Sequence, residues 1–280
     1  MNNLYLCSFA SQDLKVSTSR FIKQSQEMEF YKDIKVFGWN ELSSNKKKQI
    51  EIFFKKNNKR LFGYACWKPE IILKYMDTVP KESIIQYSDI GCHLNKNGKE
   101  RLKEYANLAS KHNILAFKYI KPNLKTEKKL KFQIYFENEY TKNDMFEYFE
   151  IPKNSSIRNS EQVWSGTMFI KNNKETKEFL KKWLNVCNLS NLIDDSLSIK
   201  KDCQEFVEHR HDQSAFSILC KLNNVFCLSA SECEWAEDEK GRFWDHLKDY
   251  PILAKRDKKL NFLKRFFFRQ LKNIKRIINK

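Results

Sequence analysis

A dense group of ionisable side chains occupies residues 208–214, directly before an apolar stretch typical of a helix. His209 and His211 are two of only five histidines in the chain. Histidine and aspartate side chains could hold a metal ion, Arg210 could bind a phosphate group, and Asp212 or Glu208 could act as a base or nucleophile. The same segment would also fit a solvated helix start that Asp212 caps. The density of reactive groups favours a functional site.

A second acid, Asp89, directly follows an apolar run at residues 84–88 that is typical of a buried strand. In open α/β sheets ligands bind beyond the carboxyl ends of the strands, so this carboxylate would point into the ligand crevice. Carboxylate oxygens suit Mg²⁺ or Mn²⁺ bridging a diphosphate. Alternatively, Asp89 forms a turn before Gly91.

Two shorter groups could also contact a ligand. Trp67 beside Lys68 offers an aromatic platform next to a phosphate-directed charge, although a core tryptophan and a surface lysine would give the same pattern. Gln162 lies shortly before Ser165 and Gly166. A glycine there would let the backbone approach a ligand closely, or would mark a bulge.

Four segments together resemble a family of bacterial capsular and lipopolysaccharide glycosyltransferases with the GT-A fold. They are Trp-Lys-Pro before a helix, IIQYSDIGCHLN, EQVWSGTMFIKN and EHRHDQSAFSILCK, within roughly residues 4–222. Their order also resembles the glycogenin/galactosyltransferase-like group. The resemblance implies hexosyltransferase activity: a sugar moves from a nucleotide donor, expected to be a UDP-sugar, to a hydroxyl of a capsule, lipopolysaccharide or lipooligosaccharide glycan.

Position by position, the resemblance also implies residue roles. Asp89 would be the first acid of a D-x-D-type motif that holds the metal and the nucleotide diphosphate. Asp212 and Gln213 would be the catalytic pair that faces the sugar and the acceptor. The further donor-binding residues, including the phosphate-directed arginine described above, are expected to be Arg20, Trp67, Lys68, Ser165, Gly166 and Arg210.

One departure from the family pattern concerns the metal ion. The D-x-D motif needs a second acid two positions after the first, where this chain has Gly91. Mn²⁺ or Mg²⁺ would then be held by Asp89 and a later residue, for which the candidates are His209, His211 and His246. Alternatively, basic side chains would neutralise the diphosphate.

The elements that must position these residues follow from the hydrophobic pattern. Short apolar runs alternate with longer amphipathic segments, which predicts an α/β fold: a Rossmann-like mixed sheet of the GT-A type, flanked by helices. We expect strands near residues 4–10, 33–37, 84–88, 114–119 and 164–170, with a short one at 133–136. Helices are expected near residues 20–31, 40–60, 70–76, 99–111, 174–186 and 212–222.

The net charge of +17 is unevenly distributed. Residues 255–280 contain eleven Lys or Arg against one acid, Asp257, and so supply +10 of that charge. Apolar residues recur there every three or four positions, which predicts a basic amphipathic helix, typical of attachment to an anionic membrane surface. A helix packed on the domain would show the same spacing. We therefore expect a GT-A domain at 1–250 and a membrane-associating tail at 251–280.

Other classes of protein fit the sequence less well. The eight cysteines form no C-x-x-C pair, the N-terminus lacks signal-peptide features, and no apolar run approaches the roughly 20 residues of a membrane span. These features predict a cytoplasmic protein with free, mostly buried thiols. Together with the basic tail, they predict that the protein lies on the inner face of the cell membrane. The charge and the aromatic residues would also suit a nucleic-acid-binding protein or nuclease. Because the basic residues concentrate on the tail, no nucleic-acid partner is expected.

Overall fold

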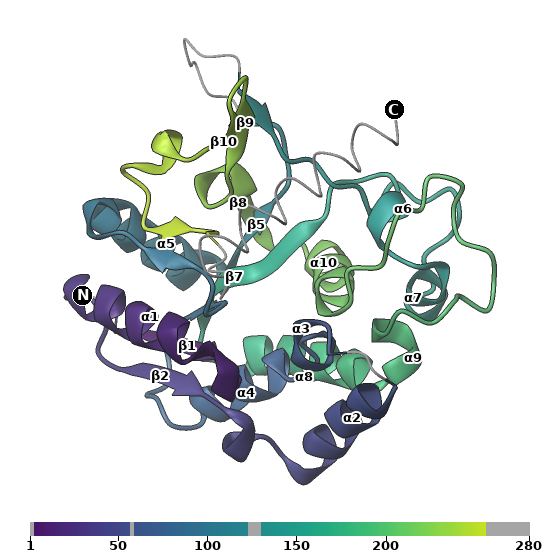
Figure 1. Ribbon diagram of the computed structural model, residues 1–280, viewed down its shortest axis with the longest axis horizontal. Coiled ribbons are helices and arrows are strands. Elements are labelled where there is room, and N and C mark those ends of the chain that lie inside the picture. Colours follow the sequence, from purple (N-terminus) through teal and green to yellow (C-terminus); the bar gives the residue numbers. More distant parts are fainter. Residues whose placement is uncertain (1–2, 57–58, 123–129, 256–280) are drawn as a thin grey trace, which may run out of the picture.

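A six-stranded sheet forms the centre of the molecule, in the strand order β2-β1-β3-β7-β5-β8 (Figure 1). The structure is a computed structural model that describes residues 3–56, 59–122 and 130–255. Strand β7 is antiparallel to both of its neighbours, β3 and β5, whereas the other pairings are parallel. The strands are β1 Leu4–Phe9, β2 Ile34–Phe37, β3 Ile84–Ser88, β5 Ile114–Lys118, β7 Val163–Lys171 and β8 Phe226–Ser229.

Helices cover both faces of this sheet, which explains why β3 and β7 are buried almost throughout. One face packs on α4 (Lys68–Met76), α8 (Lys174–Asn188) and α10 (Asp212–Leu222). The other face packs on α1 (Lys15–Glu27) and α5 (Lys99–His112). This arrangement confirms the predicted α/β fold with a mixed sheet flanked by helices.

Smaller elements surround this frame. The further helices are α2 Ser44–Lys55 and four short ones, α3 Leu61–Tyr64, α6 Glu137–Tyr140, α7 Asn143–Tyr148 and α9 Ser190–Ile193. Two small sheets contain β4 His93–Leu94, β6 Lys131–Phe132, β9 Ala236–Asp238, β10 Gly241–Phe243 and β11 Ile252–Leu253. Single 3₁₀ turns lie at Gln12–Leu14, Trp39–Glu41, Lys96–Gly98, Ala230–Glu232 and Asp245–Leu247.

Helix α1 begins five residues before the expected start at residue 20, and the helix expected at residues 40–60 is α2, at residues 44–55. Because residues 17–19 are all polar, the hydrophobic pattern does not indicate the first turn of α1. The Thr18 and Ser19 hydroxyls donate to backbone carbonyls four residues back, so these side chains lie within the helix at little cost. The expected strand at residues 133–136 is instead β6, at residues 131–132.

The described chain ends with residues that pack on the domain. Strand β11 pairs with β4, and Ile252 is fully buried. Residues 256–280, which hold most of the expected basic tail, lie outside the described residues. No described helix has the length and apolar character needed to cross a membrane. The eight cysteines are all free and six of them are buried, as predicted.

Replacing Gly98 by alanine should destabilise the domain by displacing the chain before β11. A Cβ atom at Gly98 would lie 2.2 Å from the backbone nitrogen of Pro251. Overpacking of this kind typically costs about 1–3 kcal/mol of the free energy of unfolding, which urea denaturation would measure. Gly38→Ala is the matched control, because its Cβ would meet nothing closer than 3.5 Å. Equal stability of the two variants would contradict this packing.

Candidate active site

Four of the predicted site residues meet where β3 ends and where β7, α4 and α10 begin. The ammonium nitrogen of Lys68 lies 2.8 Å from Oδ2 of Asp212 and 3.3 Å from Oδ1 of Asp89. It also donates to Ser165, to the backbone oxygen at 3.1 Å and to the hydroxyl at 3.2 Å. The Ser165 hydroxyl in turn donates to Asp212, at 2.9 Å. Residues far apart in the sequence thus form one polar cluster.

The members of this cluster differ in exposure. The side chains of Lys68 and Asp212 are 3% and 4% exposed, whereas that of Asp89 is 42% exposed. Burial raises the pKa of Asp212, and the Lys68 ammonium opposes this increase only in part. Burial alone would lower the pKa of Lys68, but the carboxylates of Asp212 and Asp89 outweigh it and raise this pKa overall. Lys68 is therefore a cation in the folded protein.

Tyr87 completes the cluster and was not expected from the sequence. Its hydroxyl donates to Oδ1 of Asp89 at 2.6 Å, and the Lys68 ammonium lies 5.2 Å from the centre of its ring. The only sequence signal was its position two residues before Asp89 in the strand, which places both side chains on one face. Tyr87 and Lys68 thereby hold one oxygen of Asp89 while the side chain stays accessible.

Gly166 lies beside the cluster, but close packing explains the glycine. A Cβ atom there would lie 2.2 Å from atoms of the Trp164 ring. The Gly166 carbonyl accepts a hydrogen bond from the backbone N–H of Asp89 at 2.8 Å. The residue therefore links β7 to the turn that carries Asp89.

The amide of Gln213 is oriented by a buried polar chain. Its Nε2 donates to Oε1 of Gln162 at 2.8 Å, and Nε2 of Gln162 donates to a Glu137 carboxylate oxygen at 3.1 Å. An ionised carboxylate only accepts, which fixes the orientation of both amides. Glu137, missed by the sequence analysis, is fully buried and paired with Lys221 at 2.6 Å. Oε1 is consequently the atom of the Gln213 amide that can accept a hydrogen bond.

The remaining expected donor-binding residues have mainly structural contacts. Trp67 stacks on Phe9 with ring centres 3.9 Å apart and is only 6% exposed, so its ring belongs to the core. Arg20 donates to the backbone oxygens of Ile90 at 2.8 Å and Cys92 at 2.7 Å, which holds the turn after Asp89. Arg210 stacks on Tyr135, at 3.7 Å, and on Tyr140.

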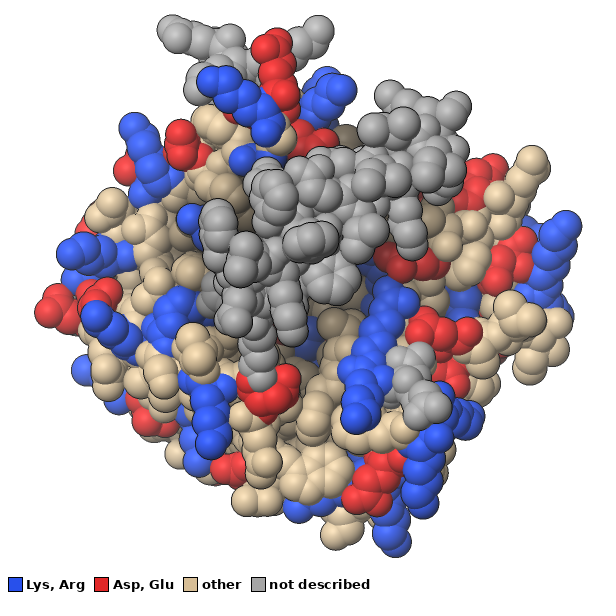
Figure 2. Space-filling model, in the orientation of Figure 1, with Lys and Arg blue, Asp and Glu red and all other residues tan. Residues whose placement is uncertain are grey.

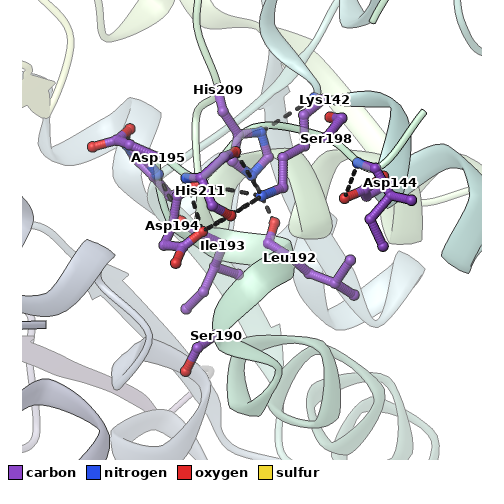
Figure 3. A network of polar contacts seen from close by, with 12 residues as sticks. Lys142, Asp144, Ser190, Leu192, Ile193, Asp194, Asp195, Ser198, His209 and His211 are labelled. Atoms are coloured by element: carbon purple, nitrogen blue, oxygen red, sulfur yellow. Dashed lines mark hydrogen bonds and ion pairs between the residues drawn. The ribbon is translucent and has the colours of Figure 1, made fainter. Parts of the chain in front are cut away.

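Two of the three candidate metal-binding histidines instead bond backbone groups near the end of α9 (Figure 3). His209 bonds the Leu192 carbonyl through Nε2 at 2.8 Å and accepts the Lys142 backbone N–H through Nδ1 at 3.3 Å. Because a carbonyl only accepts, Nε2 carries the proton and both ring nitrogens are engaged. His211 bonds the Ile193 carbonyl through Nδ1 at 2.7 Å. These contacts satisfy carbonyls that have no partner within the helix.

The described side chains do not form the expected metal site. His246 bonds the Glu234 carbonyl and packs on Phe132 and Phe243, beside the small sheet of β6, β9 and β10. Within residues 3–56, 59–122 and 130–255, no three His, Cys, Asp or Glu side chains lie together in a group that could hold a metal ion. The two acids of the cluster have an ammonium between them, so this set of donors does not fit Mn²⁺ or Mg²⁺.

Known proteins resemble this chain in their fold but not in their sequence. No protein-family model matches the chain, and no curated protein matches its sequence. One similar structure is a glycosyltransferase involved in the glycosylation of the major capsid of PBCV-1, with a TM-score of 0.51, 10% identity, and 96% of this chain and 99% of that chain covered. The galactosyltransferase LgtC (TM-score 0.42, 10% identity, 82% and 74% covered) and mouse xyloside xylosyltransferase 1 (0.40, 12%, 83% and 87%) are less similar. The chain therefore has a fold of the GT-A type.

The buried histidines should make the protein less stable in acid. Burial lowers the pKa of His209 well below its ordinary value and that of His211 to about 4. The unfolded chain, with histidine pKa values of about 6.5, then binds protons that the folded chain does not. The free energy of unfolding should therefore fall as the pH drops from about 6.5 towards 4.

Urea denaturation at pH 7.5 and 5.0 would measure this loss. His209→Gln should be less stable than the native chain at pH 7.5 but lose less stability on acidification. His112→Gln, which changes an exposed histidine, should retain the native pH dependence. An unchanged pH dependence in His209→Gln would contradict the assignment of a neutral, buried ring.

Proposed function

We propose that this protein is a glycosyltransferase that moves a sugar from a nucleotide-sugar donor, expected to be a UDP-sugar, to a hydroxyl group. The observation that carries the proposal is the cluster of Lys68, Asp89, Ser165 and Asp212 at one edge of a GT-A-type sheet. Ligands of open α/β sheets bind at this edge. The exposed Asp89 and the buried, ion-paired Asp212 provide two acids in different environments, as distinct roles at one site require.

The proposed roles follow the changes of charge during transfer. As the bond between the anomeric carbon and the diphosphate breaks, negative charge grows on the diphosphate and positive charge on the sugar. Lys68 would stabilise the first and the Asp212 carboxylate the second. The acceptor hydroxyl then bonds the anomeric carbon as the bond to the diphosphate breaks, and its proton would pass to the Asp212 carboxylate acting as a base. Asp89 would orient the donor, and Oε1 of Gln213 would contact the sugar. No step is assigned to Mn²⁺ or Mg²⁺, because the described residues do not fit either ion.

The proposed acceptor is a surface glycan of the capsule, lipopolysaccharide or lipooligosaccharide type, reached from the inner face of the cell membrane. The support comes from the sequence, because residues 255–280 supply +10 of the net charge of +17. On the face shown in Figure 2, the Lys and Arg side chains of the described residues are interspersed with Asp and Glu. An anionic membrane would therefore attract the tail more strongly than this face.

Substitution of the two acids would test the proposed roles. Asp212→Asn should lower sugar transfer by about 10²–10³-fold, as when one electrostatic contact of the transition state is lost, while changing UDP affinity little. Asp89→Asn should abolish transfer and leave the fold intact. Turnover of a panel of nucleotide sugars and calorimetry with UDP would measure both effects. Asp249→Asn, at an exposed position away from the cluster, is the control. Near-native transfer by Asp89→Asn, or loss of UDP binding in Asp212→Asn, would contradict these roles.

Deleting residues 256–280 should abolish binding to anionic vesicles. Each basic residue near an anionic surface contributes about 1 kcal/mol, and salt screens this attraction beyond about 8 Å at physiological ionic strength. In a sedimentation assay the full chain should pellet with anionic but not with neutral vesicles, and added salt should weaken the binding. Equal pelleting of the full and shortened chains, or an insoluble shortened chain, would favour a tail packed on the domain.

A further inference from the structure

We infer that Lys68 occupies the place that a divalent metal ion would take, and that this chain binds and turns over its nucleotide donor without a metal. The inference rests on the proposed function and specifies how the charge of the donor is balanced. It starts from the position of the ammonium, in contact with both Asp89 and Asp212. These are the two carboxylates of the cluster, and Asp89 is the acid expected to bind the metal.

The distances leave no separate position for an ion between the two acids. Oxygens of both carboxylates lie within 3.3 Å of Nζ of Lys68. A Mg²⁺ ion binds oxygens at about 2.0–2.1 Å, so an ion shared by these acids would overlap the ammonium or lie directly against it. Two cations so close in a buried site repel each other strongly. Metal binding would therefore require Lys68 to leave.

Lys68 is held too firmly to leave easily. Its ammonium also donates to both oxygens of Ser165, and its side chain is only 3% exposed. The residue is the first of α4, and Pro69 in the first turn fixes the direction in which the helix starts. Departure of the ammonium would leave the buried Asp212 carboxylate without a counter-charge, which is strongly unfavourable.

The rest of the site offers an ion few other ligands. Gly91 stands where a D-x-D motif would have its second acid. Both ring nitrogens of His209 are bonded, and Nδ1 of His211 bonds the Ile193 carbonyl. Nε2 of His211 is buried without a hydrogen bond, 3.7 Å from Asp195, and among the described residues no third His, Cys, Asp or Glu side chain completes a metal site there. With Asp212 paired to Lys68, the cluster would offer an ion only the Asp89 carboxylate, beside water and phosphate oxygens.

Two helix starts would supplement the charge of Lys68. Helices α4 and α10, of nine and eleven residues, begin at Lys68 and Asp212. The N-terminal end of a helix carries a partial positive charge that favours phosphate groups. The ammonium and these two dipoles are fixed before the donor binds, so they can stabilise the leaving diphosphate without reorganisation.

Nucleotide binding with and without metal tests the inference directly. The full chain, freed of metal by chelation, is titrated with UDP in a calorimeter in EDTA and again in excess Mn²⁺. The two dissociation constants should agree within about twofold, and Lys68→Met should weaken UDP binding at least tenfold, a loss of one electrostatic contact. UDP binding that is tenfold tighter in Mn²⁺, or sugar transfer that requires Mn²⁺, would overturn the inference and leave the proposed function standing.

A second measurement asks whether Mn²⁺ binds between the two acids once the Lys68 ammonium has been removed by substitution. Lys68→Ala brings two carboxylates together without a cation, so Mn²⁺ should raise its melting temperature while leaving that of the native chain unchanged. Lys46→Ala is the matched control, because Lys46 is equally buried but contacts Gln49 and Asn188 instead of acids. Absence of a Mn²⁺ response in folded Lys68→Ala would overturn the inference.

If Lys68→Ala does not fold, the titrations of the native chain decide the question alone. Failure of UDP, GDP, ADP and CMP to bind in either EDTA or Mn²⁺ would instead overturn the proposed function. The two failures are therefore distinguishable.

Discussion

The ion pair between Lys68 and Asp212 is the constraint on which the rest of the site depends. Each charge is almost fully buried, so Asp212 without Lys68 would be an uncompensated charge in the protein interior. The pair requires α4 and α10 to begin at the same edge of the sheet, beside Ser165 of β7. That requirement aligns the turn after β3 as well, because Asp89 shares the same ammonium. Tertiary structure and site geometry are thus fixed by one interaction.

A second buried charge pair, Glu137 with Lys221, performs a similar task for Gln213. Glu137 also accepts from Ser217 and Thr141, so this fully buried carboxylate has several donors. Gln162 supplies a further donor to this carboxylate, so its amide must point its N–H groups towards Glu137 and its oxygen towards Gln213. A fully buried carboxylate thereby sets the direction of the amide of Gln213. Buried polar chains of this kind specify one arrangement, since every alternative leaves an acceptor unpaired.

The sequence predicts the part of the site that depends on the order of the elements. Asp89 and Asp212 stand out because each adjoins an apolar element, and the ends of strands and helices meet at one edge of an α/β sheet. It does not predict burial. His209 and His211 have the composition of a metal site, yet both rings bond carbonyls of α9 because that short helix leaves those groups unpaired. Trp67 and Glu137 show the same limit: only the fold determines that the ring packs on Phe9 and that the acid is buried.

The segments that lead into Lys68 and Asp212 both contain strained backbone, and ion pairs and a ring contact join one segment to the other. All residues from Leu61 to Ala65 have positive φ, as does His211 just before Asp212, and such conformations persist only when their surroundings enforce them. Here the surroundings are shared: Arg60 pairs with Asp195 and Glu208, and the rings of Tyr64 and His211 lie 4.6 Å apart. Contacts with the segment before Asp212 therefore help to hold the strained backbone of the segment before Lys68. The two charged residues are held at a fixed separation before any ligand arrives, which is the condition under which fixed charges stabilise a transition state best.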